Sequence, residues 1–339
     1  MEPIDSKIFS NELKCEDIFI QNNGKEIFLN RIYSSSKEIK KSIILAPGLG
    51  NNGNLFRLDR LGRCGSLKDN KSFANMLALE GFNVYLYHPG YAENIYNNYV
   101  SQYCRQSRYY GKRYKASSTL GIDEIVNIEM PMIIEYVHNY SQGKEISWIG
   151  YSMGGMIIYF YFAKYQDDRI DRVITIGSPF SGSLLFTCIV PFINFSNKFI
   201  KYTPKFLLQY NPGSLLFFNP LNINRMILQT FLEKVLEPNT ASLEKYFSNN
   251  QFCGFSSQAK YLEFVNNLKY LKESKKFLFF FGSNDMIALP DNIFLVHQII
   301  SPDDHENLIE VTSSGHFDLI IGNNAKEKVW IPSVNWLNL

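Results

Sequence analysis

A serine lies between glycines at the junction of two apolar runs, in the segment WIGYSMGGMIIYFY (residues 148–161). The run before it, EISWIG, has the length of a strand, and MIIYFYFAKY after it is apolar on nearly every side, like a buried helix. Ser152 therefore lies at a sharp strand-to-helix turn, where Gly150 and Gly154 relieve crowding of the backbone. A hydroxyl raised above a sheet edge at a helix N-terminus is well placed to act as a nucleophile.

A serine hydroxyl at neutral pH needs a base, and that base needs a carboxylate to orient it. His316 follows the last predicted strand, in SSGHFDLI, and should lie at the same edge of the sheet as Ser152. His88, at the end of VYLYHPG, also lies at that edge and is the competing candidate. We predict that His316 is the base, because the remaining histidines fall on predicted helices or in a surface turn: His138, His297 and His305.

The carboxylate that orients the histidine should also follow a strand. Asp285 is the first acid after the strongly apolar strand in FLFFFGSND, which makes it our candidate. Asp291 and Asp318 are alternatives, and Asp318 is disfavoured because it neighbours the histidine. Asp285 could instead cap a helix, as many aspartates do.

The negative charge on a tetrahedral intermediate needs backbone N–H donors around it. One donor should be Met153, directly after the nucleophile. The other should come from the loop after SIILAP, where Gly48-Leu49-Gly50 allows the backbone to approach closely, and we select Leu49. The alternative interpretation is that PGLG forms a plain turn.

Predicted strands alternate with predicted helices along most of the chain. An antiparallel pair joined across Asn23-Gly24 comes first. Further strands are predicted within 42–50, 82–90, 145–150, 172–180, 275–285 and 307–316. Helices are predicted at 72–81, 122–140 (broken or restarted near Pro131), 156–165, 289–300 and 325–337. Such alternation predicts an α/β fold with a mostly parallel sheet covered by helices on both faces.

The alternation fails from Ser181 to about Leu262, in a stretch rich in Pro, Asn and aromatic residues. Because this stretch is too long for an ordinary connection, we predict a cap or lid inserted at 181–262 over the carboxyl edge of the sheet. Residues 1–180 and 263–339 would then form the core. Segments such as FSGSLLF, PFINF and GSLLFFNP suit an apolar acyl chain, although they could equally form the core of the cap.

Composition excludes several classes of function. The net charge of +2 and the absence of a binding module argue against a nucleic-acid partner. The segment YCRQSRYYGKRYK (103–115) could meet a phospholipid headgroup, but a solvated loop with arginines over tyrosine rings is the preferred interpretation. Five scattered cysteines without a CxxC pair predict neither a zinc site nor a disulfide framework.

The chain shows no targeting or membrane-spanning segment of the usual kind. Its N-terminus lacks the apolar stretch of a signal peptide, and the longest apolar run, 184–195, is too short to cross a bilayer and contains Pro191. We therefore expect a soluble cytoplasmic protein, whose cap could make transient contact with a membrane surface.

The chain resembles the α/β-hydrolase superfamily, and within it lipase- and esterase-like members with a cap after the sixth strand. Four motifs carry the resemblance in chain order: APGLGNN, WIGYSMGGMIIY, GSND and GHFDLIIG. It covers about residue 25 to the end, apart from the cap. Two departures are Pro47-Gly48 in place of the common His-Gly, and YHPGY in place of the usual Arg-Gly turn.

The resemblance implies a sheet of the eight-stranded type, a mainly helical cap and a triad of Ser152, Asp285 and His316. Related polyester synthases carry cysteine at the position of Ser152, so the serine favours hydrolysis over chain growth. We expect a serine hydrolase that cleaves carboxylic esters, with lipid-like medium or long acyl chains, through an acyl-enzyme and without metal or other cofactor. Acyl transfer by the same triad and a non-catalytic binding protein on the same fold are the alternatives.

Overall fold

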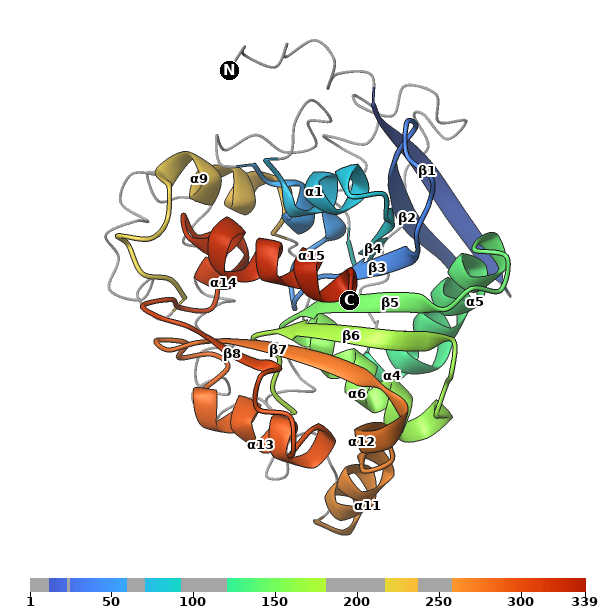
Figure 1. Cartoon of the computed structure of the whole chain (residues 1–339), viewed down its shortest axis with the longest axis vertical. Coiled ribbons are helices and arrows are strands. Elements are labelled where there is room, and N and C mark those ends of the chain that lie inside the picture. Colours follow the sequence, from blue (N-terminus) through green and yellow to red (C-terminus); the bar gives the residue numbers. More distant parts are fainter. Residues whose placement is uncertain (1–11, 23–24, 60–70, 93–120, 181–216, 237–257) are drawn as a thin grey trace.

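The computed structural model describes residues 12–22, 25–59, 71–92, 121–180, 217–236 and 258–339. These residues form an eight-stranded sheet in the order β1-β2-β4-β3-β5-β6-β7-β8 (Figure 1). The strands are β1 (Leu13–Asn22), β2 (Lys25–Ser34), β3 (Ser42–Ala46), β4 (Asn83–His88), β5 (Ile146–Tyr151), β6 (Ile170–Ile176), β7 (Lys276–Gly282) and β8 (Leu308–Val311). Neighbours from β4 through β8 run parallel, whereas β2 runs antiparallel to both β1 and β4. The predicted mostly parallel α/β sheet is confirmed.

Helices cover both faces of this sheet (Figure 1). One face carries a 3₁₀ turn, η2 (Gly53–Arg57), with α1 (Phe73–Leu79), α9 (Arg225–Lys234), α14 (Asp318–Ile321), a π turn, η5 (Lys326–Trp330), and α15 (Ile331–Leu337). The other carries α4 (Ile122–Glu124), a π turn, η3 (Ile125–Glu129), α5 (Met130–Tyr140), α6 (Met153–Tyr165), α11 (Gln258–Leu268), α12 (Leu271–Ser274) and α13 (Pro290–Ile300).

The central strands contribute side chains to a separate apolar core on each face. In β7, Phe277, Phe279 and Phe281 pack into the core that contains α6, whereas Leu278 and Phe280 pack into the core that contains α1. Because both faces are buried, the strand has a continuous apolar sequence rather than an alternating one. Each such buried side chain stabilises the fold by roughly 1.5–3 kcal/mol.

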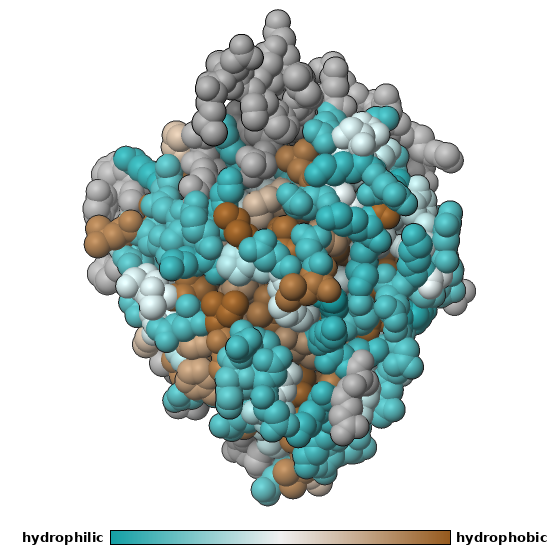
Figure 2. Space-filling model, viewed as in Figure 1, coloured by the Kyte–Doolittle hydropathy of each residue, from teal (hydrophilic) through white to brown (hydrophobic). Residues whose placement is uncertain are grey.

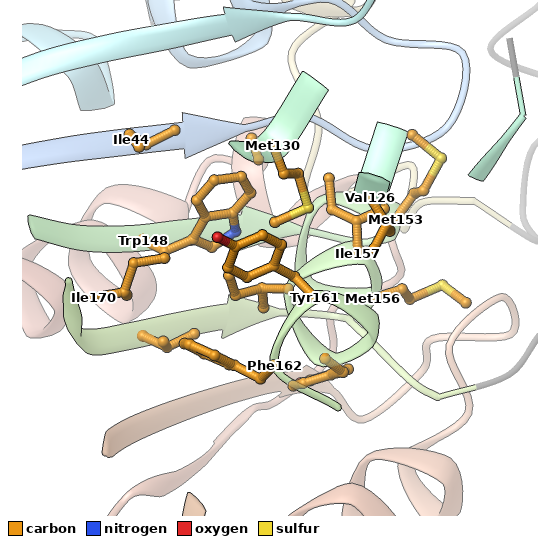
Figure 3. Packing of buried hydrophobic residues seen from close by; sticks show 14 of the residues in the cluster. Ile44, Val126, Met130, Trp148, Met153, Met156, Ile157, Tyr161, Phe162 and Ile170 are labelled. Carbon is orange, nitrogen blue, oxygen red and sulfur yellow. The ribbon is translucent and has the colours of Figure 1, made fainter. Parts of the chain in front are cut away.

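Helix α6 is buried on most of its circumference, as its sequence predicts. Figure 3 shows Met153 and Ile157 of this helix in the cluster that also holds Trp148 of β5 and Met130 of α5. The indole N–H of Trp148 donates to the carbonyl of Gly154 at 2.9 Å, which fixes the start of α6 against β5. The helix that follows the predicted nucleophile is therefore anchored to the strand that precedes it.

The segment 122–140 stays helical through Pro131, instead of breaking there. The turn immediately before, Ile125–Glu129, widens to a π turn, and a regular α-helix then continues. The same arrangement recurs at Lys326–Trp330, just before Pro332. We attribute both to the proline ring, which clashes with the carbonyl four residues earlier in a regular helix; the wider turn gives it room.

The predicted cap at 181–262 lies largely outside the described residues, and its existence as a separate unit stays a prediction. Within it, α9 is capped by Asn224, whose side chain accepts the N–H of Met226 at 2.8 Å. Helix α11 runs across residue 262, the predicted end of the cap, and packs on α6 through the rings of Phe264 and Phe160.

Several predictions from composition also concern residues outside the described part. The basic segment 103–115 lies there, as do all the cysteines except Cys15, which lies on β1. None of the described helices is long and apolar enough to span a bilayer. Figure 2 shows a face on which hydrophilic residues predominate and hydrophobic ones gather near the middle. The cytoplasmic location stays a prediction.

Candidate active site

Ser152 occupies the turn between β5 and α6 in a conformation that few side chains adopt. Its φ of 53° and ψ of −119° are strained, a cost of about 1–3 kcal/mol that the surroundings must offset. Its N–H donates to the carbonyl of Ile176 at 2.8 Å, which ties the turn to β6.

The glycines around the serine are required by close backbone contacts. A Cβ on Gly150 would lie 2.3 Å from the carbonyl oxygen of Gly154, and one on Gly154 would lie 2.1 Å from that of Ala46. Both distances are far below van der Waals contact, so neither position accepts a side chain. The Gly-x-Ser-x-Gly pattern is thus a direct consequence of how tightly β5, α6 and the end of β3 meet.

The three residues predicted to act together form one hydrogen-bonded chain. His316 Nε2 lies 2.9 Å from Ser152 Oγ, and His316 Nδ1 lies 2.7 Å from Asp285 Oδ2. Since an ionised carboxylate can only accept, Nδ1 carries the proton and Nε2 accepts from the serine hydroxyl. His316 and Asp285 are buried, and Ser152 is half-buried. This is the geometry that proton transfer from the serine to the imidazole requires.

The carboxylate of Asp285 is itself held in place by the backbone. Its Oδ1 accepts the N–H groups of Ile287 and Ala288 at 2.9 and 2.8 Å, which leaves Oδ2 directed at the imidazole. Both carboxylate oxygens thus accept hydrogen bonds. The orienting group is therefore rigid as well as charged.

Parallel strand order brings the three groups to one edge of the sheet. Ser152 follows β5, Asp285 follows β7 and His316 follows β8, and β6 lies between β5 and β7. Because the carboxyl ends of parallel strands meet at the same edge, residues 164 positions apart in the chain can touch.

The competing histidine has a different environment. His88 is fully buried; its Nε2 donates to Asn30 Oδ1 at 2.8 Å, and its Nδ1 accepts the N–H of Gly53 at 3.3 Å. Burial lowers its pKa to about 3, and the positive charge of Arg57 adds to the effect. Because both ring nitrogens are engaged by Asn30 and Gly53, His88 supports the end of β4 and not the nucleophile.

The two alternative acids also lie elsewhere. Asp291 is exposed in the first turn of α13. Asp318 is buried, but its carboxylate accepts backbone N–H groups and does not contact the imidazole. Among the three predicted candidates, Asp285 holds the position beside His316.

The glycine-rich loop after β3 lies directly over the serine. A Cβ on Gly48 would approach the Cβ of Ser152 to 3.1 Å, so the loop backbone and the nucleophile are in contact. Met153 is the first residue of α6, where an N–H has no carbonyl partner within the helix. Of the predicted donors, Met153 directly follows the serine and Leu49 directly follows Gly48; their function as an oxyanion hole stays a prediction.

The sequence alone did not identify the residues that orient this loop. Tyr91 donates its hydroxyl to the carbonyls of Gly48 and Asn51 at 3.3 and 3.2 Å, and Asn51 Nδ2 donates to the carbonyl of Leu49 at 2.7 Å. In a trans peptide, a carbonyl and the following N–H point in opposite directions. Holding the Gly48 carbonyl toward Tyr91 therefore turns the Leu49 N–H away from Tyr91.

The backbone directly before Tyr91 is held by Glu129, a buried acid on the π turn η3. Glu129 accepts the N–H of Gly90 at 3.3 Å and the hydroxyl of Tyr87. Burial raises the pKa of Glu129 to about 7. The signal in the sequence was the departure YHPGY, which contains Tyr91 and whose function only the contacts reveal.

Tyr91→Phe tests whether this tyrosine orients the loop. We expect kcat to fall roughly threefold to tenfold, because one hydrogen bond contributes about 0.5–1.5 kcal/mol, while KM changes little. Ester hydrolysis by Tyr165→Phe, which alters an exposed hydroxyl on α6, provides the control. Unchanged kcat in the Tyr91 variant would show that the loop holds its shape without this bond.

Tyr151, the residue before the nucleophile, is a second residue that the sequence did not single out. Its hydroxyl donates to the backbone carbonyl of His316 at 3.2 Å, and its ring lies 5.1 Å from the imidazole. Burial raises the pKa of Tyr151 well above its usual value, and the carboxylates of Asp285 and Asp318 add to the rise. Tyr151 therefore stays a neutral donor that fixes the histidine backbone.

Comparison with known proteins agrees with this architecture. A family model described as the alpha/beta hydrolase fold matches residues 41–187. The chain has the α/β-hydrolase fold. The fold that the four motifs predicted is confirmed, with eight strands in the sheet and the serine directly after β5.

Solved structures with the α/β-hydrolase fold resemble the chain over nearly its whole length. A serine hydrolase from the polyaromatic-hydrocarbon-degrading bacterium Cycloclasticus zankles is 15% identical with a TM-score of 0.59, covering 96% of this chain and 98% of that one. An esterase from Exiguobacterium antarcticum is 15% identical with a TM-score of 0.60, at 95% and 99% coverage. The enol-lactonase from Burkholderia xenovorans is 14% identical with a TM-score of 0.55, at 95% and 100% coverage. A search of curated proteins finds no match.

Proposed function

We propose that this α/β-hydrolase-fold protein is a serine hydrolase that cleaves carboxylic esters. The observation that carries the proposal is the chain of hydrogen bonds from Ser152 through His316 to Asp285, at 2.9 and 2.7 Å. The likeness to solved structures of a serine hydrolase, an esterase and an enol-lactonase supports it. The α/β-hydrolase fold by itself supports many reactions.

In the proposed acylation, Ser152 Oγ attacks the ester carbonyl while His316 Nε2 takes the hydroxyl proton. The carbonyl oxygen becomes an oxyanion, which the N–H groups of Leu49 and Met153 would stabilise; one such donor contributes a factor of about 10²–10³ in rate. The imidazolium then gives its proton to the alcohol oxygen as the carbon–oxygen bond breaks. The products of this half-reaction are the free alcohol and an ester of Ser152.

Deacylation repeats these steps with water. His316 Nε2 takes a proton from water as its oxygen attacks the acyl carbon, and then returns that proton to Ser152 Oγ as the acid leaves. Asp285 accepts the N–H of His316 Nδ1 and stabilises the positive imidazolium, while the N–H groups of Ile287 and Ala288 hold its other oxygen.

A fluorophosphonate probe tests this proposal most directly. Such a probe reacts with a serine only when a neighbouring base activates it, so wild-type protein should gain one adduct, located by mass spectrometry on the peptide that contains Ser152. His316→Ala should label far more slowly. An adduct on another residue, or none at all, contradicts the proposed nucleophile.

We further propose that the substrate carries an apolar acyl chain, as in a lipid or another amphiphile. The predicted cap supplies many Phe and Leu side chains. In its described part, Leu221 is 92% exposed and Met226 is 53% exposed. Large apolar side chains that face solvent near a site suit an apolar ligand or transient contact with a lipid surface.

A series of p-nitrophenyl esters measures this preference. From acetate to octanoate, kcat/KM is expected to rise about tenfold or more, because each buried methylene contributes about 0.8 kcal/mol. Rates are corrected for spontaneous hydrolysis with the Ser152→Ala protein. A steep preference for acetate would contradict the lipid-like substrate and indicate a small, closed pocket.

A further inference from the structure

A segment far from His316 in sequence is bound to the loop that carries it. We call Phe217–Asn224 the return segment and residues 312–317 the histidine loop. Hydrogen bonds that join the return segment to this loop and to the turn after α14 are Phe317 N–H to the Phe217 carbonyl (2.8 Å), Asn219 Nδ2 to the Ser313 carbonyl (3.0 Å) and Asn323 N–H to the Asn222 carbonyl (2.6 Å).

The contact between the two is also tightly packed. A Cβ on Gly315 would lie 3.0 Å from the Cα of Phe218, so the return segment lies directly against the residue that precedes the histidine. The rings of Phe217 and Phe317 stack at 5.3 Å. The histidine loop therefore has little room to move while the return segment stays in place.

Asp318 lies at the centre of this contact. Its Oδ2 accepts the N–H of Asn219 from the return segment and the N–H of Gly315 from the histidine loop, both at 2.7 Å. The side chain is fully buried. One carboxylate oxygen thus joins two segments almost one hundred residues apart, and one of its donors directly precedes His316.

We propose that Asp318 is a positioning residue that holds His316 in line with Ser152 by fastening the histidine loop to the return segment. The proposal rests on the proposed function and adds a residue to it. The backbone of His316 is then held on both sides, by Asp318 through Gly315 and by Tyr151 through the His316 carbonyl. Such support matters because a displacement of about 1 Å in a catalytic group can cost about 10² in rate.

The negative charge of Asp318 can be removed without breaking the two hydrogen bonds that its side chain accepts. Burial raises its pKa to about 6, and the nearby carboxylate of Asp285 adds to the rise; the hydroxyl of Tyr151 is the other titratable group close to both. Oδ1 has no hydrogen-bond partner among the described residues. A proton, or an amide NH₂, can therefore occupy the Oδ1 side while the remaining oxygen keeps both N–H bonds.

Two substitutions at this position test the proposal. Asp318→Ala removes both bonds, and kcat for p-nitrophenyl ester hydrolysis at pH 8 should fall about 100-fold with KM changed far less. Asp318→Asn keeps an accepting oxygen, and kcat should stay within about threefold of wild type, because the hydrogen bonds alone are preserved. The same two changes at exposed Asp291 are the matched controls.

The fall in kcat at nearly unchanged KM in Asp318→Ala, together with its recovery in Asp318→Asn, is a readout that a purely structural residue would not give. Circular dichroism and thermal melting verify folding. If the Ala variant does not fold, Asn222→Ala replaces it. This change removes the hydrogen bonds between the Asn222 side chain and Asn324, and we expect a threefold to tenfold loss of kcat.

Equal losses of kcat in the folded Ala and Asn variants, or wild-type kcat in the Ala variant, would overturn the proposal. So would wild-type kcat in Asn222→Ala where that variant replaces it. The low-field proton resonance of the bond between His316 Nδ1 and Asp285 supplies a readout that does not depend on turnover. It should persist in Asp318→Asn and weaken in Asp318→Ala. A wild-type protein that shows this resonance but neither labels nor hydrolyses esters would refute the proposed function alone.

Discussion

Replacing Ser152 by alanine is expected to lower kcat for ester hydrolysis by about 10⁴- to 10⁶-fold, to the level of residual binding and oxyanion stabilisation. The hydroxyl of Ser152 lies 2.9 Å from the base, and a methyl group in its place has no proton to give and no oxygen to attack. Steady-state hydrolysis of the best p-nitrophenyl ester measures the loss, together with the absence of an initial burst.

Ser36→Ala is the matched control for that experiment, since it makes the same chemical change in the exposed turn after β2. It should leave kcat within about twofold, as surface substitutions usually do. Activity in Ser152→Ala that survives repurification at more than a hundredth of wild type would mean that another group is the nucleophile.

The second large effect is expected for Asp285→Asn, with a fall in kcat of about 10⁴-fold. The amide carries no charge to stabilise the imidazolium, and its NH₂ can face the ring and select the wrong tautomer. The fold should survive, because the amide oxygen can still accept the N–H groups of Ile287 and Ala288. Thermal melting of the variant verifies this.

The comparison with Asp291→Asn shows whether the effect belongs to this carboxylate. That residue was an alternative acid in the sequence, and it lies exposed at the start of α13. Its variant should keep wild-type kcat. If Asp285→Asn keeps more than a tenth of wild-type kcat, a different acid must orient the imidazole of His316.

The three residues of the hydrogen-bonded chain could be predicted from sequence because each follows a strand of the parallel part of the sheet. In a parallel sheet with both faces buried, strands have continuous apolar sequences, and their carboxyl ends all meet at one edge. Ser152 and Asp285 stand just after such runs, and His316 follows β8, the short strand at the edge of the sheet, so their proximity follows from topology.

The choice among several residues at that edge depended on side-chain direction, which spacing does not encode. His88 also ends a strand, and only its bonds to Asn30 and Gly53 show that it supports the sheet. Asp318 likewise could not be assigned, because its donors come from Gly315 and from Asn219 of a distant segment.

The supporting tyrosines were missed for a related reason. Tyr91 and Tyr151 act through their hydroxyl oxygens on backbone carbonyls of other loops. Long-range contacts of this kind leave no periodic pattern. The two π turns were also unexpected, since a proline in a helical pattern indicates a break as readily as a widened turn.

The bonds between Phe217–Asn224 and the turn around His316 limit how this molecule can be recombined with its relatives. A chimera that exchanges residues 181–262 as a cassette would discard the Asn219 N–H and the Phe217 carbonyl. Asp318 and the N–H of Phe317 would then be buried without those partners, at a cost of about 1–3 kcal/mol for each unsatisfied group. A graft that retains residues 217–224 from the parent chain avoids that cost, so the useful junction lies inside the insertion and not at its end.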